Sequence, residues 1–328
     1  DVVDRIAASV YKQGEQQMAA GETALAVTSF LRVGEVAPGT AIAATAQYDA
    51  GSYLMEMGSW AQAETVLTGW RAANVSHALA ATLPAKLAEV YQQQEKWGKA
   101  ADELSVMAVS DPSDDVKRQS LYLSAQLYQK DGDIKRAVEQ YRGYVNSYPQ
   151  PFDLATEARF ELSELYLAEG NLKNRNFWLN QLVDSHDAAG AQSTERSLYL
   201  AAWATTLFAE TEFNRFKNAQ LKLPLKRSLK KKKTAMKKTL AEYEKVLNYG
   251  VADFVTEASY RIGEVYVLLG RDLMASQRPK GLDALELEQY ELLLEEQAFP
   301  FEEKGIAIHE ANAQRSWSGT YDKWTQKS

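Results

Sequence analysis

The sequence predicts an all-α fold, a right-handed α-solenoid of antiparallel helix pairs. Its composition is one reason: 328 residues include only 18 Gly and 8 Pro, so residues that break helices are sparse. The second reason is a pattern of small and large residues that recurs with a fixed step of 37 residues. No apolar run approaches the roughly 18 residues needed to span a bilayer. Cys is absent, which excludes disulfides and thiolate chemistry.

Turn residues between paired helices fall at a constant interval. Each turn is followed, after five, nine, twelve and seventeen residues, by a small residue, two larger apolar residues and a residue that ends the second helix. Gly can end the first helix by adopting positive φ, and Pro after the second helix blocks its continuation. Because each pair leaves an apolar face uncovered, the pairs must stack. The turn residues are Gly21, Gly58, Glu95 and Gly132.

Small residues also stand seven positions before each turn, at Gly14, Gly51, Ala88 and Ala125, and should let two helices approach closely. A fifth unit follows after 38 residues, with its turn at Gly170. This arrangement resembles the tetratricopeptide repeat over about residues 7–190. We therefore predict a regular array of about five repeats in residues 1–190. Residues 191–328 should form extended, atypical repeats with a basic arm and a C-terminal cap.

Beyond residue 190 the predicted helices lengthen. One helix is expected over 194–221 and a second over 225–248. The repeat pattern then returns at Gly263, Tyr266 and Gly270, with Gly270 in the turn position.

The last part of the chain is predicted to hold a loop at 278–281 and two more helices. They should cover 285–297 and 302–317, because Phe299 and Pro300 divide the apolar pattern.

Several C-terminal segments resemble a bacterial envelope family of tetratricopeptide proteins. Members of that family are periplasmic or attached to the outer membrane. Some are encoded beside TonB-type energy-transducing systems, and relatives take part in gliding motility. The resemblance implies a periplasmic protein and adds no catalytic residue. Because the chain begins at Asp1 without Met, we expect any signal peptide or membrane anchor to lie outside it. The similar segments are 221–238, 278–282, 285–292 and 299–304.

In tetratricopeptide folds the fifth position of each first helix faces a concave groove. Five of six such positions here are aromatic, and acidic residues often follow four positions later. Rings beside carboxylates suit an extended peptide or a partner helix that carries apolar and basic groups. Alternatively, the rings only pack on neighbouring helices. If they bind a partner, Ala at Tyr48 or Tyr122 should weaken binding without unfolding the array. The predicted groove residues are Tyr11, Tyr48, Tyr122, Phe160, Tyr260, Glu15, Glu89 and Glu164.

The net charge of −7 is unevenly distributed. Residues 215–238 hold eleven Lys and Arg and no carboxylate, so the remainder carries −18. This segment could attract an anionic membrane surface or an acidic protein. Alternatively, it pairs within the molecule with the acidic stretch 283–303. The acidic remainder and the lack of interleaved aromatic residues argue against nucleic acid. The basic arm consists of Lys222, Lys226, Arg227, Lys230, Lys231, Lys232, Lys233, Lys237 and Lys238.

Signals for catalysis, metals and cofactors are absent from the sequence. His77, His186 and His309 lie far apart, and each is expected to be a surface or connector residue. There is no Gly-rich phosphate loop, no Gly-x-Ser-x-Gly elbow and no His-Glu-x-x-His helix. We expect a non-enzymatic scaffold that binds protein partners, with no set oligomeric state. The alternatives are a module that binds a glycan or an anionic membrane, and the solenoid part of a larger enzyme.

Overall fold

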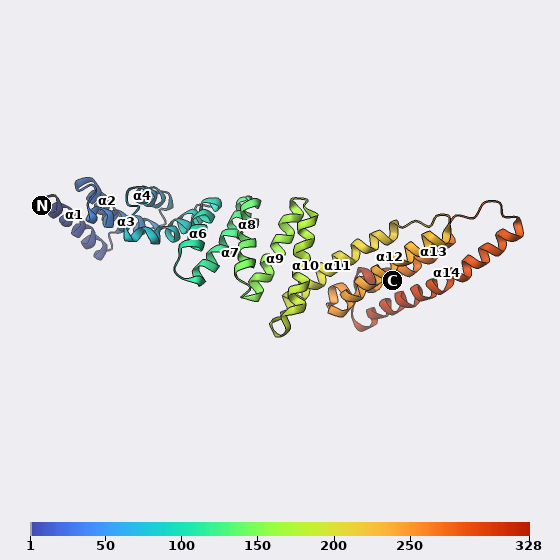
Figure 1. Ribbon diagram of the computed structural model, residues 1–328. Helices are drawn as coiled ribbons and strands as arrows, with labels where there is room; N and C mark the ends of the chain where they lie inside the picture. Colours follow the sequence, from blue (N-terminus) through green and yellow to red (C-terminus); the bar gives the residue numbers. More distant parts are fainter. Residues whose placement is uncertain (1) are drawn as a thin grey trace. The chain divides into compact units, whose positions relative to one another are not determined.

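The computed structural model describes residues 2–328, and these residues contain helices and no β-strand. The predicted all-α fold of tandem helix pairs is confirmed (Figure 1). The chain forms two compact units. Unit 1 ends at Pro151 and unit 2 begins at Phe152. The predicted change of repeat type at residue 190 therefore lies inside unit 2.

Unit 1 consists of four antiparallel helix pairs, in which each helix packs on the next one along the chain. A short 3₁₀ helix, η1 (Ala78–Thr82), precedes the third pair. The helices are α1 (Val2–Ala19), α2 (Thr23–Val36), α3 (Ala41–Glu56), α4 (Trp60–Ala73), α5 (Leu83–Gln93), α6 (Trp97–Ser110), α7 (Asp114–Asp131) and α8 (Ile134–Ser147).

The turns of unit 1 lie where the 37-residue step predicts them. Gly21, Gly58 and Gly132 have φ of 78°, 69° and 85°, and Glu95 takes the same left-handed region with φ of 56°. The small residues before the turns also act as predicted. A Cβ at Gly14 would lie 2.8 Å from the buried ring of Phe30, so only Gly lets α1 and α2 approach this closely.

Both helices of each pair contribute to the core of unit 1, and most of its largest fully buried side chains come from second helices. Phe30, Leu67, Trp70, Tyr141 and Tyr144 are almost fully buried. The Trp70 indole N–H donates to the carbonyl of Ala44 at 2.6 Å, which satisfies its polar atom inside the core.

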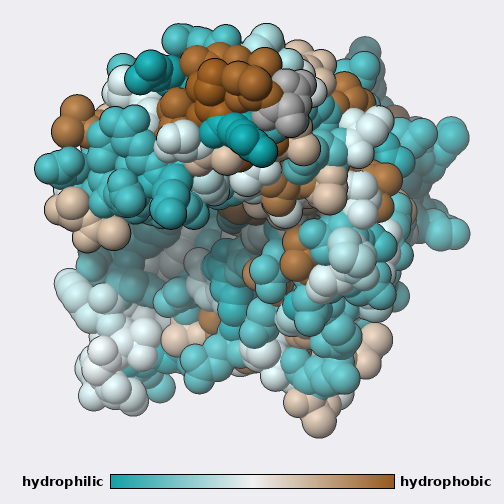
Figure 2. Space-filling view, turned by 90° about the vertical axis from the view of Figure 1, so that its left-hand side faces the viewer, coloured by the Kyte–Doolittle hydropathy of each residue, from teal (hydrophilic) through white to brown (hydrophobic). Residues whose placement is uncertain are grey.

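The N-terminal end of the chain presents an apolar surface. Figure 2 faces this end and shows a hydrophobic patch on it. α1 exposes the side chains of Val2, Val3 and Ile6.

Unit 2 begins with one more regular pair and continues with longer helices. The predicted long helices over 194–221 and 225–248 are confirmed. Among residues 2–328, every helix is too short or too polar to cross a lipid bilayer. The elements are α9 (Phe152–Ala168), α10 (Leu172–Ala189), η2 (Gly190–Gln192), α11 (Glu195–Asn218), α12 (Leu225–Tyr249), α13 (Ala252–Met274), α14 (Ala284–Ala313), η3 (Gln314–Ser318) and α15 (Lys323–Lys327).

The C-terminal region departs from the prediction at two positions. Pro300 does not divide two helices but lies inside the single helix α14. Residues on both sides of it, Leu294 and Ala298 before and Gly305 and Asn312 after, are buried. α14 packs along α13, so tertiary packing on both sides of Pro300 outweighs the cost of the missing hydrogen bond.

The second departure is Gly270, which is not a turn residue. It lies inside α13, four residues before the helix ends. Its lack of a Cβ leaves room for Glu302 of α14, whose Cγ lies 2.8 Å from where a Cβ would stand. The chain turns later, in the predicted loop between Met274 and Ala284, which includes residues 278–281.

Candidate functional site

The aromatic positions of the first helices link neighbouring pairs. In unit 1 the Tyr11 hydroxyl of α1 donates to Asp49 Oδ2 of α3 at 2.8 Å, and its ring lies 5.1 Å from that of Phe30. Burial, followed by the hydrogen bond to Asp49, raises the pKa of Tyr11 above its ordinary value. The ring remains half-buried, so one side packs and the other faces solvent.

Tyr48 requires a correction. Its side chain is only 8 % exposed, its ring lies edge-on to Trp70, and its hydroxyl is 2.5 Å from that of Thr82. Lys86 lies over the ring at 5.3 Å from its centroid. Tyr48 is therefore a packing residue first. We expect its replacement by Ala to destabilise unit 1, contrary to the sequence-based expectation.

The remaining aromatic positions are half-buried. Tyr122 of α7 packs edge-on against Tyr141 and Tyr144 of α8. In unit 2 Phe160 of α9 lies 5.4 Å from Trp203 of α11. The guanidinium of Arg196 stacks over Phe160 while it pairs with Glu157.

Tyr260, the last of these positions, lies against α14 and α15. Its ring centroid is 5.2 Å from His309 and 5.3 Å from Trp324. All five rings contact other aromatic side chains, and four of the five still show part of their surface.

The predicted groove carboxylates differ in their surroundings. Glu164 lies 3.7 Å from Arg175, and Glu264, at the equivalent position in α13, lies 3.9 Å from His309. Glu15 and Glu89 are exposed, and within residues 2–328 neither makes an ion pair. These two carboxylates are the members of the predicted set that are open to a partner.

All members of the basic arm except Lys222, which precedes the helix, lie on the first half of α12. Most of its members are exposed, and Lys233 is half-buried with its ammonium 5.3 Å from the ring centroid of Phe301. Within residues 2–328 no member with an exposed side chain makes an ion pair. The exposed members are Lys222, Lys226, Arg227, Lys230, Lys231, Lys237 and Lys238.

Lys232 is a second correction, because its side chain is 1 % exposed and cannot belong to a binding surface. Its ammonium donates to the carbonyls of Phe216 at 3.3 Å and Ala219 at 2.9 Å, at the C-terminal end of α11. It also pairs with Asp272 of α13. A cation at a helix C-terminus satisfies carbonyls that have no partner within the helix. Lys232 thus joins α11, α12 and α13. Its ion-pair partner, Asp272, lies outside the acidic stretch 283–303.

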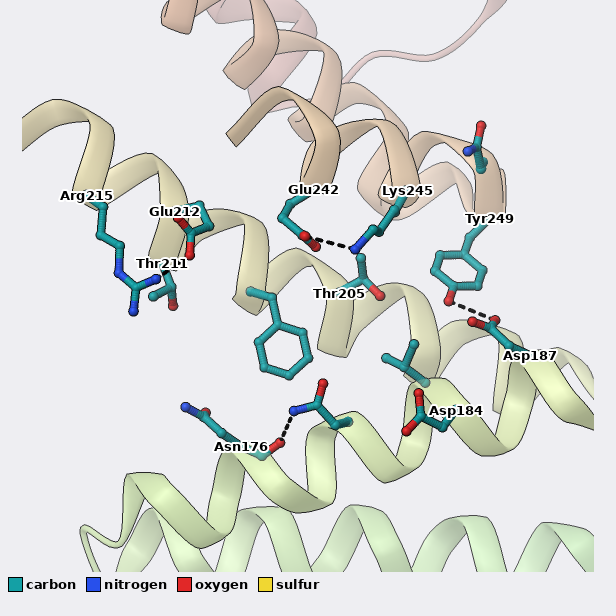
Figure 3. A pocket seen from close by; sticks show the side chains of 14 residues that line it. Asn176, Asp184, Asp187, Thr205, Thr211, Glu212, Arg215, Glu242, Lys245 and Tyr249 are labelled. Carbon is teal, nitrogen blue, oxygen red and sulfur yellow. Dashed lines mark hydrogen bonds and ion pairs between the residues drawn. The ribbon is translucent and has the colours of Figure 1, made fainter. Parts of the chain in front are cut away.

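A polar pocket that the sequence did not predict lies among α10, α11 and α12 (Figure 3). It encloses about 760 Å³. α10 and α12 form its two sides, and α11 crosses between them. The charged lining residues are Asp184, Asp187, Glu212, Arg215, Glu242 and Lys245.

The charges of this pocket are partly compensated. Glu212 pairs with Arg215 on α11, and Glu242 pairs with Lys245 at 2.8 Å on α12. The Tyr249 hydroxyl donates to Asp187 at 3.0 Å. Burial, followed by this bond to an anion, raises the pKa of Tyr249 to about 12. The pocket keeps an excess of carboxylates and suits a basic side chain of a partner.

Sequence reasoning missed this pocket because its lining comes from three helices. Asp184 and Asp187 stand on α10, whereas Lys245 and Tyr249 lie about sixty residues later on α12. The sequence held one signal of this pocket. The lining positions of α10, α11 and α12 are mostly polar, whereas helix faces that pack on each other in a helical array are apolar.

The histidine expected at the surface near the C-terminus is partly enclosed by the fold. His309 of α14 is half-buried against Tyr260 of α13, and burial lowers its pKa although Glu264 opposes the shift. Residues 2–328 contain no group of three or more His, Asp or Glu placed to hold a metal ion.

Known families match one part of the chain. The family model of the tetratricopeptide repeat matches residues 119–151, which include most of α7 and all of α8. No curated protein matches this chain. Repeats of this family generally mediate protein–protein interactions and are generally non-catalytic.

Solved structures with similar chains include three tetratricopeptide-type proteins. A tetratricopeptide repeat protein from Parabacteroides merdae is 13 % identical, with a TM-score of 0.35, 88 % of this chain and 98 % of that chain covered. A fragment of MamA from Desulfovibrio magneticus is 14 % identical, with a TM-score of 0.35 and coverages of 57 % and 98 %. The tetratricopeptide domain of P58(IPK) is 16 % identical, with a TM-score of 0.28 and coverages of 98 % and 95 %. At these values the likenesses do not bear on function.

Proposed function

We propose that this protein is a non-catalytic scaffold of the bacterial cell envelope that binds a segment of a partner protein along its first helices. The observation that carries the proposal is the recurrence of half-buried rings at one position of α1 and α7 in unit 1 and of α9 and α13 in unit 2, with a carboxylate one turn further on in α1, α9 and α13. In α5 the ring position is Ala85, and Glu89 stands one turn further on. Glu15 and Glu89 are exposed and lack an intramolecular cation within residues 2–328. Such a surface fits an extended segment with apolar and basic side chains.

Charge reversal on the first helices tests this proposal. Glu15→Lys combined with Glu89→Lys should sharply reduce the set of envelope proteins that crosslink to the tagged protein, because both carboxylates are exposed and their loss does not disturb the core. Glu35→Lys combined with Glu139→Lys is the matched control, since both residues are exposed on second helices and the change in charge is the same. An identical crosslinked set for all three proteins would rule out first-helix binding.

The cellular location belongs to the same proposal. The resemblance of the C-terminal segments to periplasmic tetratricopeptide proteins supports it. Fractionation of cells that carry the tagged full-length protein should recover it with periplasmic or outer-membrane markers. Recovery with cytoplasmic markers would contradict the location and leave first-helix binding to be judged by the crosslinking result.

A second candidate function is attachment to an anionic surface through the basic arm. It is favoured by the seven exposed cations of the arm, which make no ion pair within residues 2–328. Each Lys or Arg near such a surface contributes about 1 kcal/mol of attraction. Binding to vesicles that contain anionic lipid should therefore weaken with salt and with neutralisation of Lys230 and Lys231.

A further inference from the structure

The outer face of α14 carries a straight apolar stripe. Leu285, Leu292, Phe299 and Ile306 follow one another at intervals of seven residues, and their side chains are 64, 55, 56 and 56 % exposed. Seven residues make nearly two full helical turns, so the four side chains line up along one side of the helix. The stripe is about 32 Å long, from the rise of roughly 1.5 Å per residue.

This stripe is separate from the face that holds α14 in the fold. Towards α13, α14 buries Leu294, Ala298, Gly305 and Asn312, and it adds Phe301 and Ile308 to the core of unit 2. Their spacing alternates between four and three residues, as in the contact face of packed helices. The outer stripe therefore is not part of the core, and nothing in residues 2–328 requires it to be apolar.

Carboxylates flank the apolar stripe on both sides. Residues three and four positions beyond each apolar residue are its neighbours on the helix surface. Six of those eight positions are Glu, and all six are exposed. Within residues 2–328 none of these six carboxylates makes an ion pair or a side-chain hydrogen bond. They are Glu288, Glu295, Glu296, Glu302, Glu303 and Glu310.

A shallow hollow lies in the middle of this face. It measures about 340 Å³ and is lined by Leu292, Glu295, Glu296 and Phe299. A hollow between two apolar residues one heptad apart can receive an apolar side chain from a facing helix, as in knobs-into-holes packing.

We propose that the outer face of α14 binds an amphipathic helix of a partner protein that carries apolar residues at heptad spacing and Lys or Arg beside them. Charge complementarity selects this occupant, because six unpaired carboxylates border the apolar stripe. A second α14 is disfavoured: antiparallel pairing about Phe299 would place Glu295 and Glu296 opposite Glu302 and Glu303 of the other copy. An anionic bilayer is disfavoured for the same reason. The surface is distinct from the first-helix surface of the proposed function.

Fluorescence anisotropy with the full chain tests the proposal. The probe is a labelled peptide of about 22 residues, long enough to follow the stripe as a helix, with Leu at the heptad positions and Lys beside them. We expect saturable binding that weakens with added salt. Leu292→Asp combined with Phe299→Asp should weaken it at least about tenfold, because truncating the central anchors of an interface costs most.

Three controls keep the result decisive. Val109→Asp combined with Leu172→Asp adds the same charge at exposed apolar residues of α6 and α10 and should leave binding unchanged. Glu15→Lys combined with Glu89→Lys should also leave it unchanged, which separates this surface from the first-helix surface. A probe with Glu in place of Lys should not bind.

Three results would overturn the proposal. The first is equal affinity of the α14 variant and the Val109/Leu172 variant for the basic probe, and the second is equal affinity of the unchanged protein for the basic and the acidic probe. The third is a stable dimer in sedimentation experiments that the α14 substitutions dissociate, since a second copy would then occupy the face. Thermal unfolding by circular dichroism should be unchanged in the α14 variant, because both substituted residues are exposed.

Discussion

The regular pairs of unit 1 and the long helices α11–α14 of unit 2 carry similar residues at equivalent positions but use them differently. At the turn position, Gly58 of unit 1 has φ of 69° and ends its helix, whereas Gly270 continues inside α13. At the small position, Gly14 accommodates the Phe30 ring, and Gly263 accommodates that of His309. Close helix approach is thus common to both regions, but the turn is not.

The difference between the two regions lies in the residues that follow each glycine. Gly58 is followed by Ser59, which stands before the first residue of α4. Gly270 is followed by Arg271, Asp272, Leu273 and Met274, which continue α13. A glycine permits a turn without imposing one, so neighbouring residues and the packing partner decide. The ends of the longer helices of unit 2 are stabilised by other interactions, such as the hydrogen bonds from the Lys232 ammonium to the last carbonyls of α11.

The largest effect is expected from Lys232→Met. This change leaves the last carbonyls of α11 and the carboxylate of Asp272 without their cation, and should destabilise unit 2 by about 2–4 kcal/mol. Hydrogen exchange should show the loss of protection in α11–α13, while unit 1 keeps its protection. Lys231→Met is the control, because Lys231 is exposed on the same turn. Equal exchange in the two variants would mean that the buried ammonium does not hold these helices together.

An intermediate effect is expected from Gly305→Ala. The new Cβ would lie 3.2 Å from the backbone nitrogen of Val267 and 3.3 Å from the carbonyl of Gly263, so backbone would have to move. We expect a loss of about 1–3 kcal/mol, measured as a lower unfolding midpoint of unit 2.

The counterpart in unit 1 is Gly143→Ala in α8. Its Cβ would stand 3.7 Å from Leu121, an ordinary contact, so higher helix propensity should raise stability by up to about 1 kcal/mol. If Gly305→Ala and Gly143→Ala changed the free energy of unfolding in the same direction, the close backbone approach of α13 and α14 would not explain the effect at Gly305.

The smallest effects test the turn position directly. Gly58→Ala forces a side chain into positive φ and should cost about 1 kcal/mol. Gly270→Ala should cost less than Gly58→Ala, because the residue is helical and the contact to relieve is with the side chain of exposed Glu302, whose Cγ lies 2.8 Å from the new Cβ. Urea unfolding of the two single variants gives the comparison. A destabilisation of similar size at Gly270 would show that the side chain of Glu302 cannot move away from the new Cβ.

Much of the site could not be predicted from one sequence. The seven-residue spacing of exposed apolar residues on α14 is visible in the sequence, but it has the same form as a buried helix face. Only packing showed that Leu294 and Ala298 point to α13 while Leu292 and Phe299 face solvent. Likewise, the composition of the basic arm is evident, but the burial of Lys232 depends on where α11 ends.

The sequence by itself determined the helix pairs, the 37-residue step and the turns at Gly21, Gly58 and Gly132. These depend on local preferences, namely helix propensity, positive φ at glycine and helix-stopping residues after each pair. The tertiary structure decided that α14 passes through Pro300, that Gly270 stays helical, and which side chains remain exposed. Those outcomes depend on contacts between α13 and α14 and among α11, α12 and α13, where burial free energy exceeds the local preferences of single residues.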